Sequence, residues 1–384
     1  MKKSRLAISI LAASMIFAAT SCHDNIYYLI EQEVPQQNGL EGDINSIVPF
    51  KGNLYTSNAL IYRKTLSPSS TTGQYNYQWS QVSANDNAGN SIVNNWTHLV
   101  SLAADDTYLY CYTVKIETNK EDAVNYPGTR TVYCSTNGET WTKVTESNNK
   151  VVLFDNQVGN GKTGSSTSGR KAYLLTHETN SEGTITATKL LSLNGSATPT
   201  DITATASIDV VNATENANWI TARAIKVNGA EKIINTTAAT VNSDGTYAYY
   251  AKGSSVVCTN GNSTSDQTIE LSSGPIWALA ATGNYLLVGT TNGIYRTAIL
   301  DNGQKVSSSV SDFGNNAQTL LTSHINCIYV LDSSLSEAGT DEYASLSILG
   351  PLSSAADSFK ETGLYAFYPG RGNWNRDGDS SKKK

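Results

Sequence analysis

The sequence predicts an all-β protein built from repeated units of short strands, and three observations support this prediction. Charged residues make up only 16% of the 384 residues, whereas Tyr (21) and Gly (29) are abundant, a composition typical of strand-rich extracytoplasmic proteins. No apolar periodicity of 3.6 residues is sustained beyond the first twenty residues, which argues against helices. One phrase of strands and turns also returns more than 200 residues later, which indicates an architecture made of copies.

The repeated phrase is clearest in residues 275–300, PIWALAATGNYLLVGTTNGIYRTAIL, which we interpret as three strands joined by two tight turns. Gly and Asn stand at the expected turns because they tolerate positive φ, and β-branched and aromatic residues fill the strands. Residues 47–66, IVPFKGNLYTSNALIYRKTL, contain GN, T-x-N and IYR in the same order. The two stretches therefore predict equivalent parts of two units.

The first residues predict a segment that targets the chain for export. Three cations within residues 1–5 precede an apolar run over residues 6–19, and small residues then lead to Cys22. This order resembles the lipobox of bacterial lipoproteins, with Ala19 where Leu is commonest. The resemblance implies that residues 1–21 are a lipoprotein signal peptide and that Cys22 is the lipidated mature N-terminus. An ordinary secretory signal followed by an incidental Cys is the alternative.

The mature chain is expected to consist of a tether, a repeating body and a tail. Residues 22–43 carry the lipidated Cys and form the tether, although the apolar phrase at residues 26–30 could instead pair with the end of the chain and close the body. Residues 44–376 form the repeating body, and residues 377–384 a polar tail.

The body divides into units with a spacing of about 40 to 55 residues, each with about four short strands. The units are 44–82, 96–144, 150–211, 219–272, 275–311 and 324–375. Residues 219–272 are harder to divide and contain either one unit with an insertion or two units.

Four short strands at this spacing are the signature of a β-propeller blade. A four-stranded sheet cannot bury both faces alone, and radial stacking covers each face with a neighbour. We therefore predict a β-propeller of about six blades, with seven as the alternative count. A pair of β-sandwich domains would also produce short alternating strands, but it does not explain the repeated phrase.

The most specific motif in the body is STNGETW, residues 135–141. It resembles the short form of the Asp-box, S-x-D-G-x-x-W, a turn between outer strands of propeller blades, with Asn137 in the place of Asp. An Asn there can hydrogen-bond the backbone of its own turn, Gly138 permits the required φ, and Trp141 packs beneath. The motif is structural in sialidases, so it supports the fold and indicates no activity.

We predict no catalytic, metal or cofactor site, because no constellation of suitable residues stands out. The four His (23, 98, 177 and 324) are scattered, and none lies at ligand spacing from Cys, Asp or Glu. No Ser-His-Asp or Cys-His arrangement can be identified. A sialidase would also need three Arg around a carboxylate and acidic partners, and only seven Arg follow residue 21.

Four cysteines follow Cys22. Cys111 and Cys134 are expected in neighbouring strands of one unit, so a cross-strand disulfide between them is compatible with the spacing and with an oxidising compartment. The alternative is that all four are buried free thiols, since each occupies an apolar position in a strand.

The charge of the chain excludes one class of partner. The net charge is −6, and removal of residues 1–21 takes away three cations and no anions, which leaves −9. A surface that binds nucleic acid or anionic lipid would need the opposite sign. We expect no nucleic-acid partner, and we expect the membrane to be contacted only through the lipid on Cys22.

The leader SCHDNIYYLIEQEVP, residues 21–35, and the phrases IYRK and IYRT, residues 61–64 and 294–297, look like those of propeller-type lipoproteins of treponemes. The resemblance spans most of the chain and implies only the fold and the cellular location. We therefore expect a non-enzymatic protein, anchored in the outer membrane on its periplasmic or exposed face. It would bind a protein or glycan partner or act as an envelope scaffold. A glycan-active, glycoside hydrolase-like enzyme on the same scaffold is the alternative.

Overall fold

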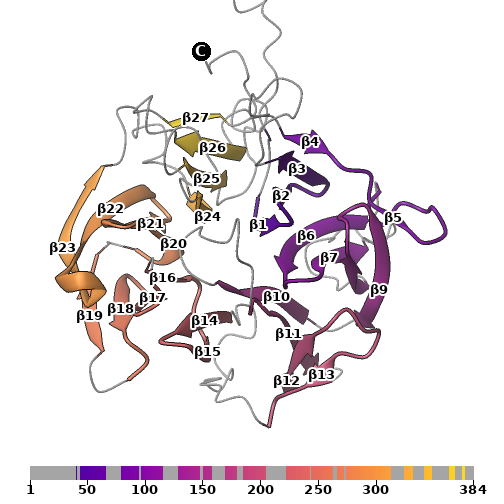
Figure 1. Ribbon diagram of the computed structural model, residues 1–384, viewed down its shortest axis with the longest axis horizontal. Helices are drawn as coiled ribbons and strands as arrows, with labels where there is room; N and C mark the ends of the chain where they lie inside the picture. Colours follow the sequence, from indigo (N-terminus) through magenta and orange to yellow (C-terminus); the bar gives the residue numbers. More distant parts are fainter. Residues whose placement is uncertain are drawn as a thin grey trace, which may run out of the picture. The chain divides into compact units, whose positions relative to one another are not determined.

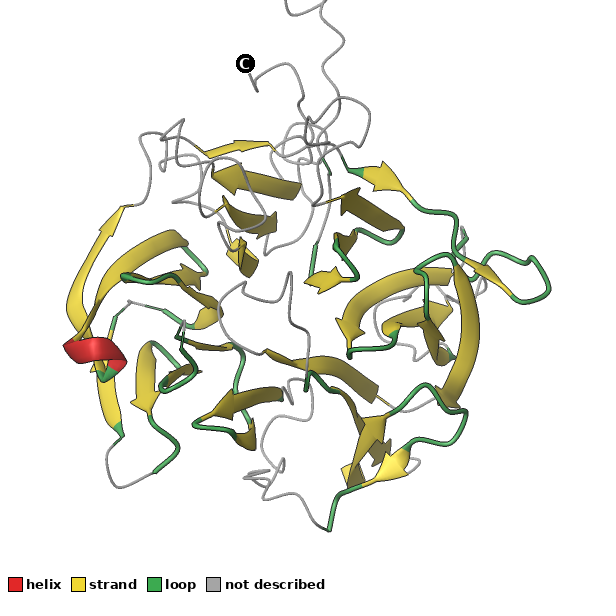
Figure 2. Cartoon of the chain, viewed as in Figure 1, coloured by secondary structure: helices red, strands yellow, loops and turns green. Residues whose placement is uncertain are grey.

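The computed structural model describes most of the repeating body. The described residues are 40, 44–65, 79–94, 97–115, 129–147, 150–157, 169–179, 185–204, 222–242, 244–262, 266–271, 274–312, 324–331, 341–347, 363–367 and 374–376. All of them belong to one compact unit, Gly39–Asp377. Figure 2 shows that this part of the chain is made of strands, with a single-turn 3₁₀ helix, η3 (Asp301–Gly303). The predicted all-β class is confirmed.

The strands form blades in which each strand pairs antiparallel with the next along the chain. Blade 1 contains β1 (Ile47–Phe50), β2 (Asn53–Ser57), β3 (Ile61–Thr65) and β4 (Ser80–Gln81). Blade 2 contains β6 (Thr97–Ala104), β7 (Leu109–Lys115), β8 (Arg130–Ser135) and β9 (Thr140–Ser147), and the short β5 (Asn85–Asp86) pairs parallel with β9. Blade 3 contains β10 (Lys150–Gln157), β11 (Ala172–Thr179), β12 (Ile185–Leu193) and β13 (Thr200–Asp201).

The second half of the body continues in the same way. Blade 4 has two described strands, β14 (Arg223–Val227) and β15 (Ala230–Ile234). Blade 5 contains β16 (Ala239–Val241), β17 (Ala248–Lys252), β18 (Ser255–Thr259) and β19 (Gln267–Glu270). Blade 6 contains β20 (Ile276–Ala281), β21 (Tyr285–Thr290), β22 (Gly293–Leu300) and β23 (Lys305–Asp312). Blade 7 contains β24 (His324–Leu331), β25 (Asp341–Ser347), β26 (Gly363–Phe367) and β27 (Trp374–Arg376).

Both predicted blade counts have a counterpart in the structure. Hydrogen bonding defines six sheets, because a short parallel pairing of residues 156–157 with residues 224–225 joins β10 to β14. Packing defines seven blades, because β14 and β15 form a hairpin of their own beside blade 5. Residues 219–272, which the sequence left as one unit or two, therefore contain two.

The first strands of the blades are neighbours in a fixed order. Along the chain each first strand contacts the next, in the order β1, β6, β10, β14, β16, β20 and β24, and β24 contacts β1. These strands lie nearest the middle of the view in Figure 1. The arrangement is that of a β-propeller, as predicted.

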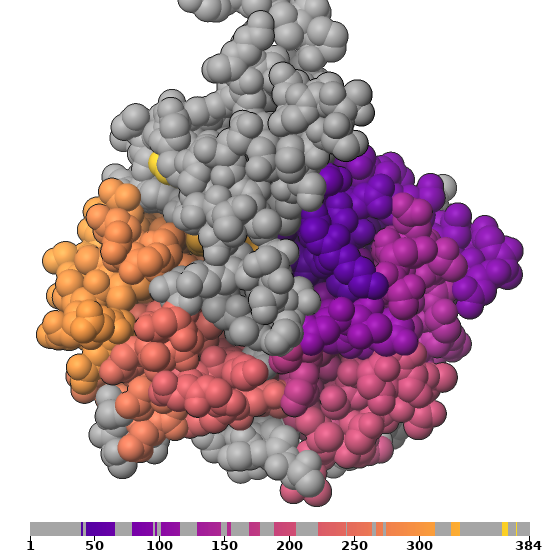
Figure 3. Space-filling view, viewed as in Figure 1, coloured from indigo at the N-terminus to yellow at the C-terminus, as the bar shows by residue number. Residues whose placement is uncertain are grey.

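Each pair of neighbouring blades shares one cluster of buried apolar side chains. Blades 1 and 2, for example, bury Phe50 and Tyr55 from one side and Leu109, Cys111 and Trp141 from the other. Similar clusters lie between blades 2 and 3, 3 and 4, 4 and 5, 5 and 6, and 6 and 7. On the face seen in Figure 3, the atoms of blade 1 (indigo) and blade 2 (purple) form a continuous surface. Each blade face is thus buried by the neighbouring blade, as the repeat pattern predicted.

The first and last blades are joined by contacts of their own. Ile44 and Leu54 share a buried cluster with Leu364 and Ala366. The backbone N–H of Leu364 donates to the carbonyl of Leu40 at 2.9 Å, so the chain that precedes β1 bonds to β26. The apolar phrase at residues 26–30, which might have supplied this contact, lies outside the described residues.

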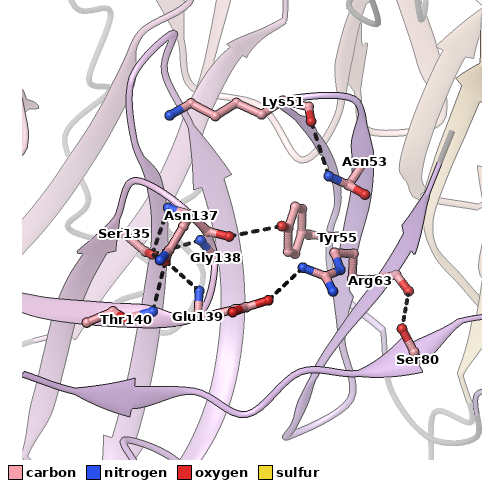
Figure 4. Close-up of polar contacts among 10 residues, drawn as sticks. All are labelled: Lys51, Asn53, Tyr55, Arg63, Ser80, Ser135, Asn137, Gly138, Glu139 and Thr140. Carbon is pink, nitrogen blue, oxygen red and sulfur yellow. Dashed lines mark hydrogen bonds and ion pairs between the residues drawn. The ribbon is translucent and has the colours of Figure 1, made fainter. Parts of the chain in front are cut away.

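The turn at residues 135–140 adopts the geometry that its sequence predicts. It connects β8 and β9, the third and fourth strands of blade 2 (Figure 4). The Asn137 side chain accepts from the backbone N–H groups of Glu139 and Thr140, both at 2.9 Å, through Oδ1. Ser135 Oγ accepts from the N–H of Gly138 at 2.8 Å. Gly138 has φ +79°, and Trp141 is completely buried.

This turn also docks blade 2 onto blade 1. Tyr55 Oη of β2 donates to the carbonyl of Asn137 at 3.4 Å, and Lys51 Nζ donates to the carbonyl of Thr136 at 2.8 Å. Arg63 Nη1 lies 2.9 Å from Glu139 Oε1 (Figure 4). A Cβ on Gly138 would lie 2.6 Å from Tyr55 Oη, so only Gly allows the turn to approach so closely.

The same close approach recurs between other blades. In each case a glycine with positive φ, in the turn between the third and fourth strands of one blade, lies against the preceding blade, and we call these the junction glycines. The junction glycines are Gly138 on Tyr55, Gly195 on Tyr108, Gly261 on Val227 and Gly303 on Tyr247. The hydroxyl of Tyr249 donates to the Gly303 carbonyl at 2.9 Å, as that of Tyr55 does to Asn137. Three of the four glycines thus lie on a Tyr ring of the previous blade.

Of the two alternatives for Cys111 and Cys134, the structure has free thiols and no disulfide between them. Cys111 lies opposite Tyr133 and Cys134 lies opposite Tyr110, so the two cysteines are one residue out of register. Because side chains alternate between the faces of a sheet, the two thiols point to opposite faces. Cys111 is buried between blades 1 and 2, and Cys134 between blades 2 and 3. The sequence showed that the strands are neighbours but not their register.

The close approach of Gly138 to Tyr55 predicts a specific loss of stability. Gly138→Ala should lower the free energy of unfolding by about 2–4 kcal/mol, through the strain of positive φ and the clash with the Tyr55 ring. Gly52→Ala is the matched control, because Gly52 has φ +76° and a Cβ at this position would meet nothing within 4 Å. It should cost about 1 kcal/mol, measured by denaturant unfolding.

A double-mutant cycle separates the clash from the backbone strain. Tyr55→Leu removes the ring atoms nearest Gly138, so Gly138→Ala should cost less in that background than in the native protein. Equal costs for Gly138→Ala and Gly52→Ala would contradict the proposed role of this contact.

The burial of the cysteines predicts their reactivity. Burial raises the pKa of Cys258 to about 12 and raises those of Cys111 and Cys134. The thiolate is the reactive form, so at pH 8 a thiol with a pKa of about 12 is ionised in roughly one molecule in ten thousand. We expect these thiols to resist iodoacetamide in the native protein and to react after denaturation without reductant, as followed by mass spectrometry. If Cys111 and Cys134 stay unmodified until reductant is added, they are bridged.

Candidate functional site

The candidate site is a cavity of about 300 Å³ where the first strands of all seven blades meet. Its described lining residues are Asn45, Ser46, Ile47, Val48, Ser101, Leu102, Tyr112, Val152, Leu153, Phe154, Arg223, Thr237, Ala238, Ala239, Trp277, Ala278, Leu279, Asn326, Cys327, Ile328 and Tyr329. Only Tyr112, on β7, lies outside the first strands and the residues that lead into them. The cavity is therefore a product of the whole repeat and belongs to no single blade.

Strand edges give this cavity a polar wall. Five of the first strands, β1, β6, β16, β20 and β24, stand at the end of their sheet, so one edge of each has no partner among the described strands. Hydroxyl groups of neighbouring blades satisfy some of these backbone groups. Ser46 Oγ accepts from the N–H of Leu102 at 2.9 Å, and Thr237 Oγ1 donates to the carbonyl of Ile276 at 2.6 Å. Edge groups of this kind otherwise need water or a ligand, so the cavity suits polar contents.

Two β-bulges place side chains at the cavity. The register of β20 shifts between Ile276 and Ala278, and that of β24 shifts between Ile325 and Cys327. The extra residues are Trp277 and Asn326, and both line the cavity. A bulge re-aims a side chain that a regular strand would direct into the sheet packing, and bulges are frequent beside binding sites.

Trp277 is held in place by two contacts. Its indole N–H donates to Thr291 Oγ1 at 3.1 Å, and its ring lies 5.1 Å from that of His324, at an interplanar angle of 46°. Thr291 belongs to the turn between β21 and β22, so the second strand pair of blade 6 orients a side chain of its first strand. The indole is thus a fixed aromatic surface at the cavity.

The described wall of the cavity contains one charged side chain. Among the described lining residues, Arg223 is the one that carries a charge, and none is Asp or Glu. Arg223 Nη1 donates to the carbonyl of Ala222 at 2.8 Å. Burial raises the pKa of Tyr112 to about 12 despite the opposing effect of Arg130, so its phenol stays protonated at neutral pH. The wall therefore offers a cation, hydroxyls, amides and aromatic rings.

The residues that the sequence singled out do not form this site. Cys22 lies outside the described residues, and Cys111 and Cys134 are core residues. Asn137 and its turn join two blades, in keeping with the structural role expected for the motif. No group of three or more His, Cys, Asp or Glu that could hold a metal occurs among the described residues. In the described part of the chain, no helix is long and apolar enough to cross a membrane.

Sequence reasoning missed Trp277, Asn326 and Arg223. Trp277 lies in the repeated phrase and was interpreted as an ordinary strand residue. In β20, IWALAA, the extra residue is Trp277, whereas the equivalent strand of blade 1, IVPF, pairs without an extra residue. That single-residue difference was the available signal, but an unbroken apolar run does not show where a bulge lies.

No protein-family model matches the chain, and no curated protein matches it. Among solved structures, the chain is similar to the Malassezia sympodialis allergen Mala s 1 at 12% identity, over 87% of this chain and 96% of that one, with a TM-score of 0.42. It is similar to Saccharomyces cerevisiae Sqt1 at 9% identity, over 85% and 83% of the two chains, with a TM-score of 0.40. A PQQ-bound aldose sugar dehydrogenase from Streptomyces coelicolor is 9% identical over 81% and 90%, with a TM-score of 0.38. Likenesses this distant carry no argument about ligand or activity.

Proposed function

We propose that this protein is a lipid-anchored β-propeller of the cell envelope that binds a protein or glycan partner without catalysing a reaction on it. The observation that carries this proposal is the cavity, where seven blades contribute to one wall of aromatic, amide and hydroxyl groups. A composite site of this kind suits recognition, because side chains from distant parts of the sequence converge on one volume.

The chemistry of the wall supports binding over hydrolysis. Glycoside hydrolysis generally uses two carboxyl groups on either side of the scissile bond. The described lining residues include no Asp or Glu, and only one of the seven Arg that follow residue 21. A glycan-active enzyme would have to draw its acid and base from outside these residues.

The proposed location in the cell envelope rests on the N-terminal sequence. The cationic start, the apolar run and Cys22 together support export and lipidation. The net charge of −9 after removal of residues 1–21 makes an electrostatic attachment to an anionic membrane unfavourable, so a covalent lipid is the proposed link. The protein would then present its propeller at the outer membrane, on the periplasmic or the exposed face.

The anchor is tested by Cys22→Ala, with Cys327→Ala as a matched control that removes a thiol from the body. Cys22→Ala should move the protein from the membrane fraction to the soluble fraction, and Cys327→Ala should leave it in the membrane fraction. Membrane retention of Cys22→Ala would contradict the lipoprotein assignment.

The face of the membrane is tested by adding protease to intact cells that express the native protein. Digestion in unbroken cells would assign the propeller to the exposed face and direct the partner search to external proteins and glycans. Protection until the envelope is broken would assign it to the periplasm, where crosslinking should capture an envelope protein. Release of a shortened glycan product on incubation would favour the enzymatic alternative.

A further inference from the structure

We infer that the central cavity binds a small saccharide that carries a carboxylate, such as a uronic acid. The inference rests on the proposed binding role and names its ligand class, but it does not depend on the lipid anchor. Three properties of the cavity carry it, namely its size and polar wall, the fixed indole of Trp277, and the cation of Arg223.

The size and wall of the cavity favour a compact ligand rich in hydroxyl groups. A volume of about 300 Å³ is at the lower end of the range of ligand pockets, about 300–1,000 Å³. Hydrogen-bonding groups reach it from several directions, from strand edges and from polar side chains such as Asn45, Ser101 and Asn326. An extended peptide would pair with a single strand edge, whereas a pyranose carries hydroxyls around its whole ring. The arrangement therefore favours the sugar.

Trp277 provides the apolar contact that a sugar ring needs. One face of a pyranose presents C–H groups, which pack against an aromatic ring, while its hydroxyls stay at the rim. The bulge in β20 brings Trp277 to the cavity, and Thr291 and His324 orient it. A platform that is already oriented loses little entropy when a ligand binds, which favours affinity for a small molecule.

Arg223 selects for a carboxylate. A guanidinium forms paired, charge-assisted hydrogen bonds with a carboxylate, and no Asp or Glu among the described lining residues opposes an anion there. The chain as a whole is negatively charged, so an anionic sugar would be disfavoured elsewhere on the protein. Among the described lining residues, this cation therefore favours an anionic ligand.

The inference is tested by calorimetric titration of the purified protein with D-glucuronate and D-galacturonate, and with D-glucose and D-galactose as the neutral counterparts. We expect the uronates to bind about tenfold or more tightly than the neutral sugars, because only they form the charge-assisted pair. Tryptophan fluorescence should change on binding in the native protein and lose that change in Trp277→Phe.

Substitutions of Arg223 and Trp277 assign the roles of these two residues. Arg223→Gln should remove the preference for uronate and leave binding of the neutral sugars within about twofold, whereas Arg223→Lys should retain part of the preference. Arg63→Gln, which removes the half-buried cation of β3 that pairs with Glu139, is the matched control and should bind as the native protein does. Trp277→Ala should weaken binding of all four sugars. Unfolding curves that coincide with the native one establish that each variant is folded.

Failure to bind either uronate, equal binding of uronates and neutral sugars, or a preference that survives Arg223→Gln would overturn the inference. These results are independent of the anchoring experiment. If Cys22→Ala releases the protein from the membrane but the protein binds no sugar, the proposed envelope role stands and only the proposed ligand is wrong. If the protein binds uronates but the Cys22→Ala variant stays in the membrane fraction, only the proposed anchor is wrong.

Discussion

The structure depends on one constraint, that each blade has two apolar faces and can bury neither of them alone. The two faces of β7 show this most clearly. Tyr110 is buried against blade 3, and the next residue, Cys111, is buried against blade 1. Strands buried on both faces cannot alternate apolar with polar residues, so they read as continuous apolar runs such as LAA, LYCYTV and IWALAA. The same constraint brings the last blade to the first, where Leu54 packs with Leu364.

The outer turns determine how closely neighbouring blades approach. A junction glycine carries no side chain, so its backbone can lie on a ring of the preceding blade, as Gly303 lies on Tyr247. The hydroxyl of a second-strand Tyr then donates to a carbonyl of the same turn, as Tyr55 and Tyr249 do. Gly and Tyr thus occur together at these junctions for a common structural reason. These contacts orient the blades at their outer ends, whereas nearer the centre the blades are held together by packing of apolar side chains.

At the centre the same architecture leaves a different environment. Five of the seven first strands have a described partner strand on one side only, and these strands and the side chains beside them border the shared cavity. Bulges in β6, β20 and β24 each add one residue near the start of the first strand, whereas blade 1 pairs residues 47–50 with residues 53–56 without interruption. The repeat itself only builds the scaffold, so a specific function is expected from the side chains that differ between blades at the shared cavity, such as Trp277 and Asn326.

The sequence by itself determined the all-β class, the positions of most strands and the geometry of the turn at Asn137. These follow from local chemistry, namely apolar runs, Gly and Asn at positive φ, and a side chain that bonds the backbone of its own turn. The repeated IYR phrase likewise predicted that Arg63 and Arg296 occupy equivalent third strands, β3 and β22. Only the tertiary structure decided the register of Cys111 against Cys134, the separation of β14 and β15 as a blade, and the convergence of Arg223, Trp277 and Asn326 on one cavity. A one-residue shift of register, a bulge and a contact between distant strands are set by packing across the sheets, and no local pattern in the chain records them.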